Sequence, residues 1–498
     1  MNQKYNHIFD TSHLQSDMKK RSLQSGAITL SSQVIMFVLQ LGSTMILARI
    51  LSPRDYGINA MAISITGFAG MFSHLGLSTA IVQKENINHD QVSTLFWINA
   101  LIGIMMMLIV AAISPVAAWF YKTPEMFLVM LSMSIIFAIN GLSVQHSALL
   151  IRQMRFLSIA KIDITSLLAG IVVALITGYY GFGYWALVFN SLTNSAVHTI
   201  GCWFCCKWLP GRPIRNAGVS SMIKFGFDLI GFNVINYFAR NLDNVLIGRY
   251  YGSFTLGLYD KAYQLLMMPI RNIRDPLTNV ALPALSRLQK EPEQYRNYYL
   301  KCVSLLAFVS MPLVTFMFFF SDRIIYLLLG PQWGGASDIF KILAIAALMQ
   351  PVASTVGMVL ISTGRTRLYL IMGAINAIVI SFSFLAGLHW GAKGVATGYA
   401  VANYLIMLPQ LFYTFKDTSI NIQNFFYSVF KPLFASLVMG GGCFLLVRLI
   451  GNINVVVTLA ISSLVSSLIY LLIFAIFPSG MKNLHDYYAY SKLIFNRK

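Results

Sequence analysis

Charged side chains are scarce in this chain. They make up 11% of its 498 residues, against roughly 25% in an average soluble domain. Hydrophobic residues make up 57%, and they gather in nearly uncharged runs such as 102–112, 305–320 and 455–477. Lipid offers backbone amides no hydrogen-bond partner, so a chain crosses it as a helix of about 20 mostly apolar residues. The scarcity of charge therefore excludes an ordinary soluble protein and predicts an all-α integral membrane protein.

Three further absences narrow the function. The five cysteines include one CxxC pair, Cys202 and Cys205, but no second Cys or His pair that would complete a zinc site. The chain contains no Walker motif, so an ion gradient, a partner or the substrate gradient would supply the energy. No expected loop exceeds roughly 20 residues, which is too short for a folded soluble domain. We expect no bound metal and no cofactor.

The apolar runs predict about fourteen transmembrane helices. The expected helices are 25–50, 56–80, 92–119, 125–149, 156–179, 183–206, 220–250, 254–284, 297–320, 336–362, 367–388, 391–414, 428–450 and 454–477. They divide the chain into a tail (1–24), a first six-helix lobe (25–207), a linker (208–219), a second six-helix lobe (220–415), a helix pair (416–477) and a second tail (478–498).

The positive charge of the chain indicates its orientation. A net charge of +19 would suggest nucleic acid in a soluble protein, but in a membrane protein Lys and Arg gather on cytoplasmic loops. With the N-terminus inside, most of the Lys and Arg residues fall on inside segments. The first 24 residues are polar and lack a cleavage site, as expected of a cytoplasmic tail. We therefore expect both termini in the cytoplasm and no nucleic-acid partner.

A short internal repeat relates the two lobes. Leu47-Ala-Arg49 is followed by Gly57, and Ile247-Gly-Arg249 is followed by Gly257 at the same spacing. The offset corresponds to six expected helices, an even number, so both copies have the same orientation in the membrane. The sequence thus predicts two parallel six-helix repeats followed by a helix pair. We expect Arg49 and Arg249 to snorkel, and the two glycines to serve turns or helix contacts.

Several segments together resemble the bacterial polysaccharide exporters, which include colanic acid and O-antigen flippases of the multidrug/oligosaccharidyl-lipid/polysaccharide exporter superfamily. The order and spacing of these segments carry the resemblance over residues 25–370. One departure is His74, where members often carry an acid before Leu-Gly-Leu. The matching segments are Leu47-Ala-Arg-Ile-Leu-Ser-Pro-Arg-Asp-Tyr-Gly57, Phe72-Ser-His-Leu-Gly-Leu-Ser-Thr-Ala-Ile-Val-Gln83, Asn241-Leu-Asp-Asn-Val-Leu-Ile-Gly-Arg249, Leu256-Gly-Leu-Tyr-Asp-Lys-Ala-Tyr-Gln-Leu265, Leu282-Pro-Ala-Leu-Ser-Arg-Leu-Gln289 and Gly330-Pro-Gln-Trp333.

The resemblance implies a function that the composition alone does not. It implies two lobes around a cavity and transport of undecaprenyl-pyrophosphate-linked oligosaccharide from the cytoplasmic to the periplasmic leaflet of the inner membrane. The expected partners are the lipid-linked oligosaccharide, membrane lipids, and the polymerase and chain-length machinery of polysaccharide synthesis.

Charges inside the expected helices mark candidate site residues, because a charge in a membrane helix usually faces a cavity or a partner. On the eighth helix, Asp260, Arg271, Arg274 and Asp275 fall on one stripe at helical spacing, with Pro269 and Pro276 as expected kinks. Arginine binds pyrophosphate through a bidentate fork. The candidate substrate-binding residues are Arg271, Arg274, Arg240 and Lys261, and the candidate ion-coupling residues are Asp243, Asp260 and Asp275.

Structural alternatives stand beside these roles. Arg271 can pair with Asp275 one turn away, and Arg240 with Asp243. Asp163, an acid within a helix of the first lobe, lies near Lys161, where an interfacial salt bridge is expected.

Two other functions remain open. A multidrug or small-cation antiporter of the same superfamily would share the fold, and the seventh and eighth helices carry as many acids as bases, among them Asp228. A membrane glycan polymerase or ligase would need a sizeable periplasmic loop with catalytic groups. The sequence predicts no such loop, so we expect a transporter rather than an enzyme.

Overall fold

The computed structural model describes most of the chain. Three features noted in the sequence lie outside the described residues: His74 and the side chains of Asp228 and of the basic residues at 19–21. The described residues are 18–73, 87–214, 220–449 and 454–478, with single positions or short stretches at 9, 78, 81–82, 84, 218, 480–485 and 487, and most side chains of 18–24 and 220–239 are excluded.

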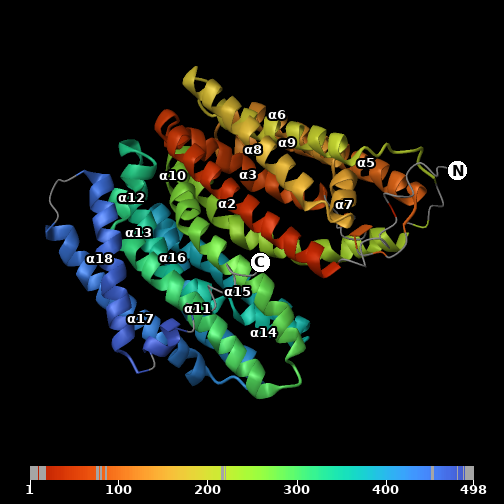
Figure 1. Ribbon diagram of the computed structural model, residues 1–498. Coiled ribbons are helices and arrows are strands. Elements are labelled where there is room, and N and C mark those ends of the chain that lie inside the picture. The colour runs from red at the N-terminus through yellow and green to blue at the C-terminus, as the bar shows by residue number, and fades with distance from the viewer. Residues whose placement is uncertain are drawn as a thin grey trace. The chain divides into compact units, whose positions relative to one another are not determined.

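The described residues form helices joined by short connections (Figure 1). Every expected span has a helical counterpart whose ends differ by a few residues, and the all-α prediction is confirmed. The helices that correspond to the expected spans are α2 (Met18–Ile50), α3 (Pro53–Ser73), α5 (His89–Tyr121), α6 (Glu125–Gly141), α7 (Val144–Arg152), α8 (Phe156–Tyr179), α9 (Trp185–Cys206), α10 (Ser220–Arg287), α11 (Pro292–Phe319), α13 (Gly335–Ala353), α14 (Val356–Ser362), α15 (Thr366–Gly387), α16 (Gly391–Phe415), α17 (Ile422–Leu449) and α18 (Val455–Ile476).

The helices have the length and composition of membrane spans. Within the described residues, eight helical segments are long and apolar enough to cross a bilayer. One of these segments, Thr366–Phe415, contains both α15 and α16, and the pair α6–α7, bent by 42°, would be a ninth. The chain is therefore a multi-pass membrane protein.

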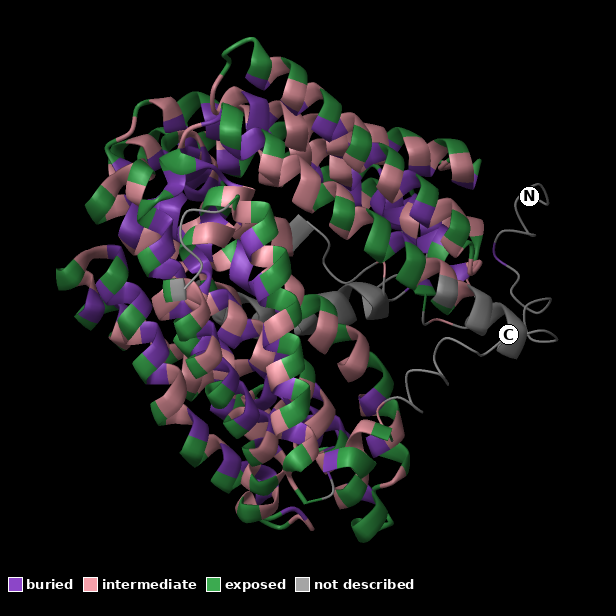
Figure 2. Ribbon diagram, turned by 60° about the vertical axis from the view of Figure 1, so that its left-hand side comes forward, coloured by how far each residue is buried: buried purple, intermediate pink, exposed green. Residues whose placement is uncertain are grey.

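The outer surfaces of the helices are apolar as well. Large hydrophobic side chains are widely exposed, among them Trp119 (78%), Phe204 (76%) and Leu464 (68%). Figure 2 shows exposed residues along the outer sides of the helices of each unit and buried residues between them. Such a surface would aggregate in water, and it suits lipid chains.

The chain divides into two compact units, Met1–Gly257 and Leu258–Lys498. The long helix α10 passes from one unit to the other, and its dihedral angles leave the helical region at Gly252, where φ is +78°. The two expected helices 220–250 and 254–284 correspond to the segments on either side of this residue. Helical structure continues through Pro269 and Pro276.

The same elements recur in both units. The fourth expected helix is interrupted between α6 and α7, and the tenth, six helices later, between α13 and α14. Arg155 precedes α8 and donates to the carbonyl of Cys205 at the end of α9 (2.9 Å), while Arg365 precedes α15 and donates to the carbonyl of Lys416 at the end of α16 (2.8 Å). These recurring elements support an internal repeat, and the two arginines fasten corresponding helix ends. The parallel orientation of the two halves stays a prediction.

Two features of the fold were not predicted from the sequence. A short helix, α12 (Ser321–Leu328), follows α11, and its Asp322 binds Lys341 of α13 at 2.7 Å. Arg152, expected only as a cytoplasmic charge, is buried and donates to the carbonyls of Ile81 (2.8 Å) and Lys84. A buried guanidinium needs several acceptors, and these carbonyls hold the segment before α5 against α7.

Candidate functional site

A polar cavity opens within the first unit between α3, α6 and α9. Its volume is about 540 Å³, within the range of small-molecule sites. The apolar part of its wall comes from side chains such as Ile63, Met133 and Phe137. The polar side chains of the wall are Thr66, Asn140, Ser143, Asn190, Ser191, Asn194, Ser195 and His198.

Helical spacing places most of these polar groups together. Asn190, Asn194 and His198 follow one another at intervals of four residues and lie on one face of α9, as side chains at i and i+4 do. This spacing is visible in the sequence and could have identified the site. These side chains were not among the predicted site residues, because amides and hydroxyls are common in membrane helices and only charged side chains mark a site by their cost in lipid.

Small residues bring the polar face of α9 close to its neighbours. A Cβ on Gly170 of α8 would lie 2.8 Å from the side-chain oxygen of Asn190, so α8 and α9 pack at backbone distance. Ser195 donates a hydrogen bond to the side-chain oxygen of Asn140 on α6. Asn140 and Ser143 flank the interruption between α6 and α7. Interrupted helices commonly line the substrate sites of transporters.

One ionisable pair stands at the cavity. Nε2 of His198 lies 3.5 Å from Oδ1 of Asp163 on α8, and the side chains are 30% and 34% exposed. The sulfur of Cys202 lies 3.8 Å from Nδ1 of the same histidine. The expected pairing of Asp163 with Lys161 is therefore wrong: Lys161 is exposed, two residues along α8, where its side chain points to another face.

The second unit has a polar link at the corresponding place. Gln350, just before the interruption between α13 and α14, donates to the hydroxyl of Tyr399 on α16 at 2.7 Å. It parallels the bond from Ser195 to Asn140. In both units a polar side chain near the interruption is thus hydrogen-bonded to a later helix: Asn140 to α9 in the first unit, and Gln350 to α16 in the second.

Two candidate residues from the sequence meet through a third. Lys261 donates to the amide oxygen of Gln264 at 2.8 Å, and the amide nitrogen of Gln264 donates to Asp260 at 2.6 Å. The Lys261 side chain is buried within the second unit. Gln264 bridges the two opposite charges. It was not among the predicted site residues, because its side chain is uncharged.

Arg271 and Arg274 of α10 have different surroundings. Arg274 forms a two-pronged contact with the carboxylate of Asp275, at 2.9 Å from Nε and 2.7 Å from Nη2. Both nitrogens contact the same oxygen, Oδ1. The alternative pairing of Asp275 with Arg271 is not the one observed, because the ion pair of this carboxylate is with Arg274. Arg271 is exposed.

The remaining two candidates lie in the part of α10 that belongs to the first unit. Asp243 is buried, and its carboxylate accepts the backbone N–H of Asn244 at 2.8 Å. Arg240 is exposed. Their pairing with each other stays a prediction.

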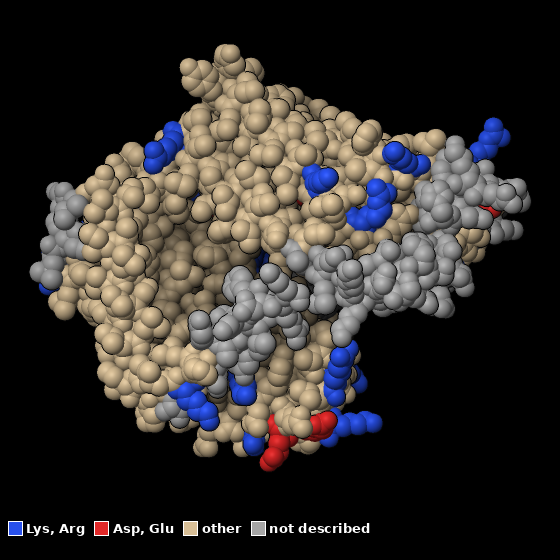
Figure 3. Space-filling view, in the orientation of Figure 1, with Lys and Arg blue, Asp and Glu red and all other residues tan. Residues whose placement is uncertain are grey.

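Charges are sparse on the described surface as well. On the face shown in Figure 3, Lys and Arg are scattered over wide areas without charge. Among the residues that the structure describes, no three His, Cys, Asp or Glu side chains gather closely enough to hold a metal ion. The polar cavity of the first unit gathers amide and hydroxyl side chains around one ionisable pair, which is a lining that can hydrogen-bond a polar molecule.

Sequence comparison identifies the family. Residues 46–338 match the model of the polysaccharide biosynthesis protein family. The chain belongs to this family. It is similar to the teichuronic acid biosynthesis protein TuaB of Bacillus subtilis (strain 168), 28% identical over 86% of this chain and 88% of the relative. It is also similar to the lipopolysaccharide biosynthesis protein WzxC of Escherichia coli (strain K12), 23% identical over 84% and 86%.

Solved structures show the same fold. The lipid II flippase MurJ in an inward closed conformation has a TM-score of 0.72 at 15% identity, covering 90% of this chain and 98% of that one. An inward-facing multidrug resistance MATE transporter of the MOP superfamily has a TM-score of 0.58 at 11% identity, covering 76% and 93%. The resemblance to the bacterial polysaccharide exporters, suggested by the sequence segments, is confirmed by the family match and the curated relatives.

Proposed function

We propose that this protein is a flippase. It moves an undecaprenyl-pyrophosphate-linked oligosaccharide repeat unit across the inner membrane, from the cytoplasmic to the periplasmic leaflet, by alternating access. The single observation that carries the proposal is the polar cavity of α3, α6 and α9, lined mainly by amides and hydroxyls, in a chain of the polysaccharide biosynthesis family. The names of the relatives and the fold shared with a lipid II flippase support it.

The chemistry of the cavity suits a saccharide. A sugar is neutral and carries hydroxyl groups that both donate and accept hydrogen bonds, and an amide side chain can do the same. Burying a hydroxyl without a partner costs roughly 1–3 kcal/mol. A wall bearing Asn140, Asn190 and Asn194 supplies partners and lowers this cost, while a strongly charged wall would favour an ionic solute.

The pyrophosphate of the proposed substrate is anionic, so cationic side chains are needed to bind it. We propose that Arg271 and Arg274, with Arg240 and Lys261, contact the pyrophosphate. Arg271 is exposed and available for an ion, whereas Arg274 is held by Asp275. The pyrophosphate would have to compete with that carboxylate, so Arg271 carries the larger share in this proposal.

Transport against a gradient needs a coupled ion. The proposed coupling groups are Asp243, Asp260 and Asp275. Asp260 is linked to Lys261 through Gln264, so gain of a proton by Asp260 would alter the contact of a neighbouring cation. We place the protein in the bacterial inner membrane with both termini in the cytoplasm, where the polymerase and chain-length machinery would act on its product.

The second candidate function is export of small cations, which the fold shared with a MATE transporter favours. Deletion of the protein in its host separates the alternatives. A flippase deletion should accumulate completed repeat units on the cytoplasmic leaflet and abolish surface polysaccharide. Unpolymerised units in the periplasm would indicate a polymerase or ligase, and an unchanged glycan would indicate a small-solute antiporter.

A further inference from the structure

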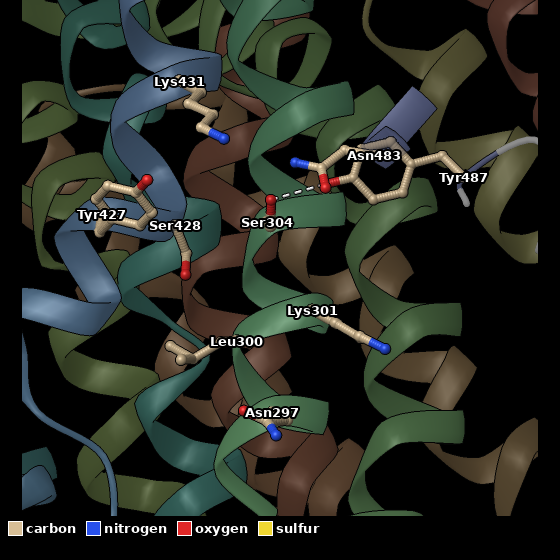
Figure 4. A pocket seen from close by; sticks show the side chains of 9 residues that line it. All are labelled: Asn297, Leu300, Lys301, Ser304, Tyr427, Ser428, Lys431, Asn483 and Tyr487. Atoms are coloured by element: carbon tan, nitrogen blue, oxygen red, sulfur yellow. Dashed lines mark hydrogen bonds between the residues drawn. The ribbon is translucent and has the colours of Figure 1, made fainter. Parts of the chain in front are cut away.

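The second unit contains a basic pocket away from the candidate transport residues of α10. It lies between the first turns of α11, the first half of α17 and the segment 480–487, and its volume is about 320 Å³. Figure 4 shows its side chains around a common space. The lining residues are Asn297, Leu300, Lys301, Ser304, Tyr427, Ser428, Lys431, Asn483 and Tyr487.

The wall of this pocket offers almost only hydrogen-bond donors and hydroxyls. Two lysines supply positive charge, and none of the described lining residues is an Asp or a Glu. Lys431 is half-buried; it donates to the carbonyl of Pro478, and its ammonium lies 5.7 Å from the ring centroid of Tyr427. These contacts leave its remaining N–H groups for a ligand, because an ammonium has three donors. Such a wall selects an anion.

The far side of the pocket is fixed in place. The hydroxyl groups of Tyr487 and Ser304 lie 2.7 Å apart and join the segment 480–487 to α11 (Figure 4). Tyr487 also packs on Phe308, with ring centroids 4.9 Å apart. The amide of Asn483 on the same segment faces the space between the helices (Figure 4). The pocket therefore has three walls, and the third is the chain that follows α18.

The surroundings indicate that the anion is part of a lipid. Over the three turns that follow Tyr427, α17 exposes Phe430 (53%), Phe434 (44%) and Leu437 (57%). A headgroup at the two lysines would thus continue into acyl chains over an exposed apolar helix face. Lys301 and Lys431 both lie on segments that the charge distribution predicts to be cytoplasmic, and basic pockets between helices on that side bind anionic headgroups.

We propose that this pocket binds the phosphate of an anionic membrane phospholipid. The two ammonium groups neutralise the phosphodiester, the Asn483 amide and the serine hydroxyls bond its oxygens, and the acyl chains lie along α17. The site is separate from the proposed substrate contacts, so it does not depend on the proposed function. It gives the helix pair α17–α18 a binding role outside the repeats.

The test uses the full-length protein purified in detergent and titrated with phosphatidylglycerol, with native mass spectrometry counting bound lipid. The variant K301Q/K431Q should bind the lipid roughly 10- to 30-fold more weakly than the wild type. The matched control K290Q/K416Q removes the same charge from exposed lysines of the same unit outside the pocket. It should bind like the wild type. Equal binding by both double variants would overturn the proposal.

A second variant and two competitors define the ligand. Asn483→Asp adds a carboxylate beside the two lysines and should weaken binding at least as much, with the protein still monodisperse. Phosphatidylcholine and inorganic phosphate should not displace phosphatidylglycerol. Displacement by inorganic phosphate would make this a free-anion site and would contradict the assignment to a lipid, as would unchanged lipid binding by Asn483→Asp.

Discussion

Gly57 and Gly257 pack backbone against backbone. A Cβ on Gly57 would lie 1.7 Å from the carbonyl oxygen of Ser253, and a Cβ on Gly257 would lie 1.8 Å from the carbonyl oxygen of Pro53. Ser253 lies one helical turn before Gly257, and Pro53 lies one turn before Gly57. Each glycine therefore contacts the carbonyl that lies one turn before the other glycine. These are the two glycines of the internal repeat, so the repeat marks a symmetric helix contact, which small residues permit.

Alanine at either glycine should destabilise the protein. A methyl group cannot fit at these distances, so α3 and the segment of α10 after Gly252 would have to separate. We expect a loss of stability of about 1–3 kcal/mol or more for G57A and for G257A, measured as a lower melting temperature in detergent.

Gly42→Ala is the matched control, because it lies in α2 with nothing within 4 Å of the added methyl. It should keep the wild-type melting temperature or raise it slightly, since alanine favours helix more than glycine does. Wild-type stability of both repeat variants would contradict the close packing.

Removal of one amide from the polar cavity should impair transport. Asn194→Leu keeps the side-chain size but loses the donor and the acceptor, so export of repeat units should fall roughly 2- to 10-fold, the effect of one hydrogen bond. Asn194→Gln keeps the amide and should retain most of the activity. The measurement is surface polysaccharide normalised to the amount of protein in the membrane. Equal loss in both variants would indicate a packing role instead.

Loss of the exposed cation Arg271 should weaken recognition of the pyrophosphate. Arg271→Gln should lower export roughly tenfold or more, the range of a charge-assisted hydrogen bond, and Arg271→Lys should restore part of it because the charge remains without the bidentate fork. Arg287→Gln, at the exposed end of the same helix, is the control and should export normally. Normal export by Arg271→Gln at normal protein level would remove this residue from the site.

The contact of Asp322 with α13 should depend on pH. Burial alone would raise the pKa of Asp322, but hydrogen bonds from Lys341 and Ser337 outweigh it and hold the pKa below its ordinary value. A lowered pKa means that the carboxylate stabilises the fold above the ordinary Asp pKa of about 3.9, and that this stability is lost as the pH falls through the lowered value.

Asp322→Asn should therefore lower the melting temperature at pH 7 and have little effect near pH 3. The side chain is 66% exposed, so the stabilisation is at most about 1 kcal/mol. Asp417→Asn, at an exposed position, should show no such pH dependence. A difference between Asp322→Asn and wild type that stays constant from pH 7 to pH 3 would contradict the account.

The membrane fold could be predicted well from the sequence, because the length of an apolar run is enough to identify a membrane-spanning helix. The expected helix 156–179 has the ends of α8, and the two glycines of the repeat, Gly57 and Gly257, do make the expected helix contact. The helix interruptions at Leu142–Ser143 and Ser354–Thr355 were not predicted, although Gly141 directly precedes the first and Pro351 lies three residues before the second. The hydrophobic run continues across both sites, and the run set the expected span. The predicted spans 125–149 and 336–362 each run across one.

The candidate site was predicted only in part. Helical spacing grouped Asp260, Arg271, Arg274 and Asp275 on one stripe, but it did not predict that Gln264 links Asp260 to Lys261. It also offered Arg271 as a partner of Asp275, whereas the adjacent Arg274 makes that contact. Contacts between distant segments could not be predicted from spacing at all. His198 pairs with Asp163 across two helices, and the amides of α9 form a cavity only when α3 and α6 pack beside them.

The most direct test of the central claim is a flipping assay with the purified full-length protein in liposomes. Undecaprenyl-pyrophosphate-linked repeat units from a deletion strain would be placed on one leaflet, and an impermeant sugar-modifying reagent would report their arrival on the other. We predict transfer of these units well above protein-free liposomes, and slower transfer with Asn194→Leu. Transfer no faster than in protein-free liposomes, by a correctly folded protein with an imposed proton or sodium gradient, would contradict the account.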